Sequence, residues 1–233
     1  MVEKIPLVLL PGVLNTEALW QYQIDALGDV AEISVGDLTS HETIADMAES
    51  GLEKAPDEFA LAGLSLGGYT AQEIVRQAPE RVTRLALLDT SARADTPGRG
   101  EGRKAQIALA QNGQFEEVVA QYVSTMLNPD APPNQELQEA IRAMCLSNGP
   151  EVFIRQQKAI MRRPDGRADL TKIDCPTLVL CGRQDQPTPL EMHEELVAGI
   201  AEAILVVVED CGHLAPLERP ESVGAALRDW LSS

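Results

Sequence analysis

Short apolar runs alternate along this chain with longer stretches of helical spacing, and this alternation constrains the possible folds more than any other feature. Each run is bounded by turn residues and is apolar at nearly every position, which is typical of strands buried on both faces of a parallel sheet. The runs are Ile5 to Leu10, Ala31 to Leu38, Phe59 to Leu64, Val82 to Asp89, Thr177 to Gly182 and Ile204 to Val208. Helices are expected between and after them, over 17–27, 44–54, 68–77, 191–199 and 221–231. The pattern predicts an α/β fold with a doubly wound, mostly parallel sheet.

The alternation stops between Ser91 and Asp174, where the sequence supplies helices but no convincing strand. Helices are expected over 103–112, 115–127, 135–147 and 151–162, with Gly113 and Gly149 at the positions of helix C-caps. A helical segment inserted after a strand of a parallel sheet lies over the edge where such sheets bind ligands. We therefore expect one domain over 1–233, with residues 91–174 forming a helical lid; this segment is called the helical insertion below.

Apolar side chains within the helical insertion raise the question of what they contact. Val118, Tyr122 and Met126 form a stripe at helical spacing, which favours packing against the core over substrate binding, because amphipathic helices bury such faces in any case. Other apolar positions suggest a pocket for a small or medium apolar group, and the candidates are Val123, Met126, Met144, Phe153, Ile160 and Met161.

Charge and composition exclude several classes of partner. Nineteen Lys and Arg against 36 Asp and Glu give a formal charge of -17, which repels phosphate backbones, and an aromatic content of 3% leaves few platforms for base stacking. No stretch approaches the roughly 20 apolar residues of a membrane helix. The apolar run near the N-terminus contains Pro6 and Pro11 and lacks a small-residue cleavage site. We expect a cytoplasmic protein that binds neither nucleic acid nor membranes.

The cysteines and histidines do not predict a metal site. Cys145, Cys175, Cys181 and Cys211 form no CxxC pair, and the three histidines lie at no recognisable ligand spacing. The four cysteines are interpreted as buried thiols, and no metal or cofactor is expected.

The strongest local signal for chemistry is the segment Gly63-Leu64-Ser65-Leu66-Gly67-Gly68, a G-x-S-x-G pattern directly after a predicted strand and before a predicted helix. The turn is so tight that the serine adopts a strained backbone, and the flanking positions must lack a Cβ to avoid a clash. The hydroxyl then projects at a helix N-terminus, where free amides favour a developing negative charge. Ser65 is the predicted nucleophile, and Leu66 supplies one such amide.

A serine hydroxyl needs a base to accept its proton, and His213 is the best candidate. It follows the last predicted strand in a glycine-containing loop. His193 is predicted to lie in a surface helix, and His41 precedes the serine, although serine, acid, histidine is the expected order.

The third member of the site should be a carboxylate that follows a strand between the serine and the histidine, where it can fix the histidine tautomer. Asp185 fits, because it follows the strand that ends at Gly182. Asp89, at the end of the fourth predicted strand, is the competing acid and is otherwise a turn or cap residue.

These segments together resemble the α/β-hydrolase superfamily. The resemblance rests on Leu9 to Val13, Gly63 to Gly68, Gly182 to Asp185, and Gly212-His213, and it spans nearly the whole chain. It implies a triad of Ser65, Asp185 and His213, with Val13 as the second amide of the oxyanion hole. The chain has Pro11-Gly12 where these proteins usually have His-Gly.

The residues and the resemblance together predict a serine hydrolase that cleaves a small to medium carboxylic ester through an acyl-enzyme. The substrate is expected to be a small molecule. Thioesters, lactones, carbon-carbon bonds of diketones and perhydrolysis remain alternatives on the same triad. A lyase on this scaffold and a non-catalytic ligand sensor are the rivals from other classes.

Overall fold

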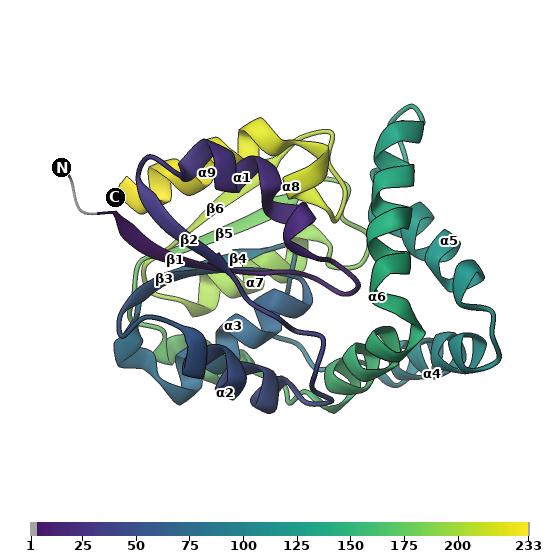
Figure 1. The fold of residues 1–233 in the computed structure, drawn as a ribbon. Helices are drawn as coiled ribbons and strands as arrows, with labels where there is room; N and C mark the ends of the chain where they lie inside the picture. The colour runs from purple at the N-terminus through teal and green to yellow at the C-terminus, as the bar shows by residue number, and fades with distance from the viewer. Residues whose placement is uncertain (1–3, 233) are drawn as a thin grey trace.

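The structure, a computed structural model, describes residues 4–232, and its centre is a six-stranded sheet in which every neighbouring pair is parallel. The strand order is β2-β1-β3-β4-β5-β6, and helices cover both faces (Figure 1). The strands are β1 Ile5–Leu10, β2 Ala31–Val35, β3 Phe59–Leu64, β4 Val82–Leu88, β5 Thr177–Gly182 and β6 Ala203–Val208. This arrangement confirms the predicted doubly wound sheet, and the strand order reverses between β1 and β3.

The helices form two layers around the sheet (Figure 1). One layer holds α2, α3 and α7, with α3 packed against β1, β3 and β4, and the other holds α1, α8 and α9. Their bounds are α1 Gln21–Leu27, α2 Ile44–Lys54, α3 Leu66–Gln77, α7 Leu190–Gly199, α8 Ala215–Glu218 and α9 Pro220–Ser232. Short 3-10 helices occur at η1 Glu17–Trp20, η2 Pro79–Arg81 and η3 Arg167–Lys172. The single helix expected over 17–27 is therefore η1 followed by α1.

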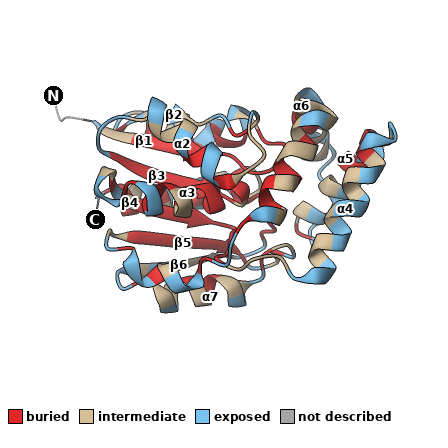
Figure 2. Ribbon diagram, turned by 90° about the horizontal axis from the view of Figure 1, so that it is seen from below, coloured by how far each residue is buried: buried red, intermediate tan, exposed pale blue. Residues whose placement is uncertain are grey.

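The core lies between these layers, and the central strands are buried along their length (Figure 2). Every residue of β3 and β5 is buried. Trp20 and Trp230 are the largest fully buried side chains. Each large apolar side chain buried in this way contributes about 1.5–3 kcal/mol to the stability of the sheet that carries the site.

The second strand is shorter than the sequence suggested. It ends at Val35, and the Gly36 amide donates to Leu9 O at 2.9 Å as the chain leaves the sheet. Asp37 then accepts hydrogen bonds from the amide and the hydroxyl of Thr39, which closes a turn where a further strand residue was expected.

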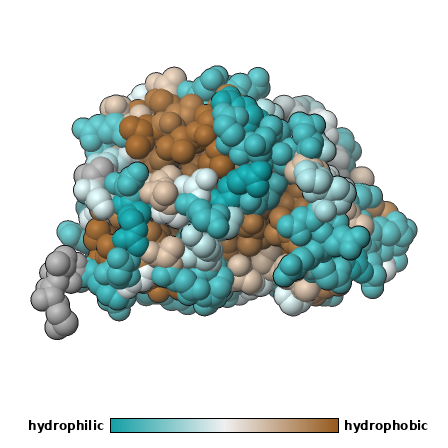
Figure 3. Space-filling model, turned by 90° about the horizontal axis from the view of Figure 1, so that it is seen from above, coloured by the Kyte–Doolittle hydropathy of each residue, from teal (hydrophilic) through white to brown (hydrophobic). Residues whose placement is uncertain are grey.

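Strand β6 forms an edge of the sheet and is less buried than its apolar sequence suggested. Only Val208 in this strand is buried, and Ile204 is 57% exposed. Figure 3 shows a patch of apolar surface on the side of the molecule where β6 lies. An edge strand has a neighbouring strand on one side only, so more of its side chains remain exposed. An apolar run therefore did not by itself imply that the strand is buried on both faces.

Within the helical insertion, three α-helices lie beyond the carboxyl ends of the strands (Figure 1). They are α4 Pro97–Gln111, α5 Phe115–Met126 and α6 Gln135–Arg162. Helix α6 joins the two helices expected over 135–147 and 151–162, with a kink at Gly149, whose φ is 78°. Helix α4 begins six residues earlier than expected, because Thr96 caps it and Pro97 occupies its first turn. Within residues 4–232, no helix is long and apolar enough to cross a membrane.

Candidate active site

Ser65 lies at the turn that joins β3 to α3, with a backbone conformation that L-residues rarely adopt. Its φ is 53° and its ψ is -110°. Two hydrogen bonds hold this strained backbone: the Ser65 amide donates to Leu88 O at 3.0 Å, and the Thr90 hydroxyl donates to Ser65 O at 2.9 Å. The end of β4 therefore fixes the turn that presents the Ser65 hydroxyl.

The glycines beside Ser65 are required by close backbone contacts. A Cβ at Gly63 would collide with the backbone of Gly67, and a Cβ at Gly67 would collide with the Leu10 carbonyl. The crossing of β1, β3 and α3 is therefore possible only because both positions lack a side chain, as the sequence pattern predicts.

Ser65, His213 and Asp185 are joined by one series of hydrogen bonds. The Ser65 hydroxyl lies 2.9 Å from His213 Nε2, and His213 Nδ1 lies 2.9 Å from each carboxylate oxygen of Asp185. Asp185 also accepts the Thr188 amide at 2.8 Å and the Thr188 hydroxyl at 2.6 Å. Asp185 and His213 are buried, whereas Ser65 is partly exposed. In this network Nδ1 donates to Asp185, which leaves Nε2 free to accept a proton from the serine.

The two candidate acids have different surroundings. Burial opposes ionisation of Asp185, but His213 and Thr188 hold its pKa below the usual value. Asp89 accepts hydrogen bonds from the amides of Gly182 at 2.9 Å and Ala215 at 3.4 Å. Burial and the neighbouring Asp185 charge raise the pKa of Asp89 well above its usual value. Asp89 thus joins the end of β5 to the loop that carries His213 (the histidine loop), while Asp185 contacts His213 itself.

Backbone amides suitable for an oxyanion lie on two sides of Ser65. Leu66 is the first residue of α3, so its amide has no partner within the helix. Val13 lies in the loop after β1, and within the described chain no hydrogen-bond acceptor is recorded for its amide. Both residues were predicted from the sequence as oxyanion donors.

The loop that carries Val13 is held by the helical insertion. The Tyr122 hydroxyl, on α5, donates to Val13 O at 2.9 Å. On α6, Gln156 Oε1 accepts the Leu14 amide at 2.9 Å, and Asn148 Nδ2 donates to Leu14 O at 2.9 Å. Leu14 has a φ of 57°, so these contacts hold a strained loop in place.

The helical insertion also contacts the histidine loop. The His213 amide donates to Met126 O at 2.8 Å, at the end of α5. The Glu218 carboxylate accepts the amides of Asn128 at 2.9 Å and Gly212 at 3.0 Å, so it bridges the two segments. The candidate base His213 and the candidate oxyanion donor Val13 are therefore both held by contacts from the helical insertion.

A cavity of about 110 Å³ opens at Ser65 and His213. Of the apolar residues suggested from the sequence, three line the cavity, namely Met126, Phe153 and Ile160. The other three, Val123, Met144 and Met161, do not line it. The Val118, Tyr122 and Met126 stripe packs against the core, as predicted, and all three residues also line the cavity. Sequence reasoning missed the polar lining, which includes Arg99, Arg103, Gln106, Gln121, Thr125 and Gln157.

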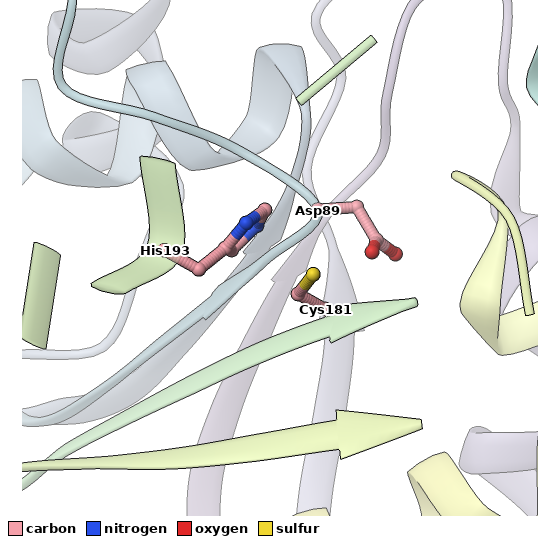
Figure 4. Close-up of side chains that lie close together, drawn as sticks. All are labelled: Asp89, Cys181 and His193. Atoms are coloured by element: carbon pink, nitrogen blue, oxygen red, sulfur yellow. The ribbon is translucent and has the colours of Figure 1, made fainter. Parts of the chain in front are cut away.

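His193 lies in a surface helix, α7, as predicted, but on the buried face of that helix. Its Nε2 accepts the Thr90 amide at 3.0 Å, and burial lowers its pKa to about 4, which keeps the ring neutral. His193, Asp89 and Cys181 lie close enough to suggest a metal site, but the Asp89 carboxylate points away from the imidazole (Figure 4). Cys181 donates to Gly182 O, and burial raises the pKa of its thiol. These groups are therefore already occupied by hydrogen bonds within the protein.

The cysteines mostly follow the prediction. Cys145, Cys181 and Cys211 are buried, whereas Cys175 is only half-buried. Burial raises the pKa of Cys145 to about 12, so this thiol stays protonated at neutral pH.

Comparison with known proteins identifies the family to which a chain with this site is similar. The model of the alpha/beta hydrolase family matches residues 7–226. The chain is 26% identical to a pimeloyl-[acyl-carrier protein] methyl ester esterase of Chromobacterium violaceum, over 98% of this chain and 84% of that protein. It is 28% identical to a 2-hydroxy-6-oxononadienedioate/2-hydroxy-6-oxononatrienedioate hydrolase of Klebsiella pneumoniae, over 76% of this chain and 63% of that protein. A thermophilic esterase of Thermogutta terrifontis, solved with malate bound, has a TM-score of 0.89 and 30% identity, covering 98% of this chain and 89% of that one.

Proposed function

The chain belongs to the alpha/beta hydrolase family and is a hydrolase, and from this premise we propose that it cleaves a small to medium carboxylic ester through an acyl-enzyme on Ser65. The observation that carries the proposal is the series of 2.9 Å contacts from Asp185 through His213 to the Ser65 hydroxyl. Relatives named as esterases support an ester as the substrate.

In the first half of the reaction, Ser65 Oγ attacks the ester carbonyl carbon while His213 Nε2 takes the hydroxyl proton. The carbonyl oxygen becomes an oxyanion that accepts hydrogen bonds from the amides of Val13 and Leu66. The bond to the alcohol oxygen then breaks, and His213 returns the proton to the leaving alcohol. Asp185 keeps the imidazole in the tautomer that this transfer needs and stabilises the imidazolium.

In the second half, water replaces the serine as the nucleophile. His213 takes a proton from water, which attacks the acyl carbonyl, and the same amides hold the second oxyanion. The bond from the acyl group to Ser65 Oγ breaks, His213 returns the proton to the serine, and the carboxylic acid leaves.

We infer that the helical insertion acts as the lid of this site. Helices α4, α5 and α6 supply most of the cavity lining, and the cavity of about 110 Å³ suits a compact substrate better than a long acyl chain. Its buried lining includes Val118, Phe153 and Ile160, which favour an apolar portion of the substrate beside the reacting carbonyl.

A fluorophosphonate probe tests the nucleophile directly, because it reacts with an activated serine. We expect labelling of the wild-type protein and none of Ser65→Ala, and a series of p-nitrophenyl esters should show turnover that falls as the acyl chain outgrows the cavity. Ser124→Ala serves as a matched control, because this exposed serine on α5 donates only to Gln121 O. Labelling that persists in Ser65→Ala would contradict the proposal.

Hydrolysis of a carbon-carbon bond is the second candidate, favoured by the Klebsiella pneumoniae relative named above. Such a reaction would use His213 to move protons to and from the carbon skeleton of a diketone. Turnover of a vinylogous diketone together with inactivity toward all p-nitrophenyl esters would favour this candidate over the ester hydrolase.

A further inference from the structure

We propose that the mouth of the cavity is an anion-binding subsite in which Arg99 receives a carboxylate on the substrate, at a position remote from the scissile bond. The inference rests on the proposed hydrolase function, because it names the class of ester that the same site would accept.

The cavity lining divides by exposure into two regions. The buried part includes the apolar Val118, Phe153 and Ile160 beside the polar Gln157, Thr188 and His213. The half-exposed and exposed part holds most of the remaining polar groups, with Arg99 and Arg103 on α4 facing the same cavity as Gln121 and Thr125 on α5. A substrate that fills the cavity therefore places its apolar portion inside and meets the guanidinium groups at the opening.

Arg99 has donors to spare for a ligand. Its guanidinium donates to the Pro187 carbonyl, and within the described chain no carboxylate lies in ion-pair distance of it. A guanidinium has five N–H donors in a planar fork, so one backbone contact leaves a pair free to bind a carboxylate. By contrast, Arg103 donates to Asp95 at 2.6 Å and to Gln157 at 2.7 Å.

Among the described residues, the cavity lining includes two arginines, Arg99 and Arg103, and no Asp or Glu, although the protein carries -17 overall. Asp95 is a single carboxylate shared by Arg103 at 2.6 Å and Arg163 at 3.0 Å. Arg103 is therefore paired with a carboxylate, whereas Arg99 is the arginine of the described cavity lining that has no carboxylate partner. A positive group at the mouth would offset the long-range repulsion that an acidic protein exerts on an anionic substrate.

Arg99 is also tied to the loop that carries the candidate acid. Pro187 and Thr188 both line the cavity, and Thr188 donates two hydrogen bonds to Asp185. The contact between Arg99 and Pro187 therefore places the guanidinium beside the loop that holds Asp185, in the cavity that also contains Ser65 and His213.

Matched esters test the subsite. The acyl-side pair is the mono-p-nitrophenyl ester of glutaric acid and its methyl-capped diester, and the alcohol-side pair is 4-carboxyphenyl acetate and its methyl ester. We expect the wild-type protein to prefer the carboxylate member of one pair in kcat/KM. Arg99→Gln should lower that ratio by about 10- to 100-fold, the effect of losing charge-assisted hydrogen bonds, and Arg99→Lys should lower it less. Arg167→Gln, which removes an equal charge from an exposed position outside the cavity, should leave the ratio unchanged.

Protection of Ser65 from the fluorophosphonate probe provides a readout that needs no turnover. Glutarate should slow labelling of the wild-type protein and have at least tenfold less effect on Arg99→Gln. The subsite is refuted if neither ester pair shows a carboxylate preference and glutarate gives no protection, or if Arg99→Gln leaves both quantities unchanged. Loss of all Ser65-dependent labelling would instead refute the hydrolase function, so the two failures are distinguishable.

Discussion

Asparagine in place of Asp185 is expected to lower kcat by about a thousand- to ten-thousand-fold, or about 4–5.5 kcal/mol of activation free energy. The Thr188 amide donates to Oδ1 at 2.8 Å, and this fixed donor keeps the asparagine oxygen at that position. The new NH₂ group then takes the place of Oδ2, which lies 2.9 Å from His213 Nδ1. Nδ1 then lies between the asparagine oxygen and a new donor, because Oδ1 is also 2.9 Å away. The donor favours the tautomer that carries the proton on Nε2, and the negative charge that stabilises the imidazolium is lost, so the ring accepts the Ser65 proton far less readily.

Asparagine in place of Asp89 should have a much smaller effect. Its amide oxygen can keep the 2.9 Å hydrogen bond from Gly182, so the substitution loses only the 3.4 Å contact with Ala215. One long, neutral hydrogen bond is worth about 1 kcal/mol or less, which corresponds to a loss of about fivefold at most.

The assay is kcat and kcat/KM on the best p-nitrophenyl ester, with thermal unfolding of each variant to show that the fold is retained. Asp185→Asn should also react with the fluorophosphonate probe far more slowly than Asp89→Asn. Comparable losses in the two variants, or a larger loss in Asp89→Asn, would refute the assignment of Asp185 as the acid that orients the histidine.

Three further changes test the supports of the site. Tyr122→Phe removes the hydrogen bond to Val13 O and should lower kcat about three- to tenfold with little change in KM, which steady-state kinetics would measure; an effect on KM alone would contradict a positioning role. Gly67→Ala should lower the unfolding free energy by about 1–3 kcal/mol, measured by urea titration, because its Cβ meets the Leu10 carbonyl. Asp89 has a raised pKa in the folded state, so it releases its proton more readily when unfolded and destabilises the fold increasingly as pH rises above its usual pKa of 3.8. In thermal scans, the Tm of Asp89→Asn minus the Tm of the wild type should therefore increase from pH 4 toward neutral pH. A decrease of this difference over that range would contradict a raised pKa of Asp89 in the folded state.

The central sheet and the glycines on either side of Ser65, Gly63 and Gly67, could be predicted because local sequence determines both. Strands buried on two faces leave continuous apolar runs, and the tight turn at Ser65 requires glycines at fixed spacing. Helix α4 was harder, because Gly98, Gly100 and Gly102 argue against a helix, although Thr96 and Pro97 carried the start signal.

The polar cavity lining and the burial of His193 depended on contacts between distant segments. Arg99 and Arg103 meet the cavity only after α4 folds over the sheet edge, which no local pattern records. For His193 a signal existed: its spacing from Leu196 and Ile200 puts all three on one helix face, and both apolar residues are buried. The neighbouring glutamates correctly indicated a surface helix, and this spacing shows which face of it is buried.

The contacts from the helical insertion to the two loops beside Ser65 bear on how the protein discriminates among substrates. Tyr122 donates to the Val13 carbonyl, and Met126 O accepts the His213 amide, so helix α5, which lines the cavity, also positions the proposed base and the proposed oxyanion donor. A molecule that fits poorly and displaces α5 would disturb both loops at once. We therefore expect poor substrates to bind and yet react slowly, so that discrimination appears in kcat more than in KM.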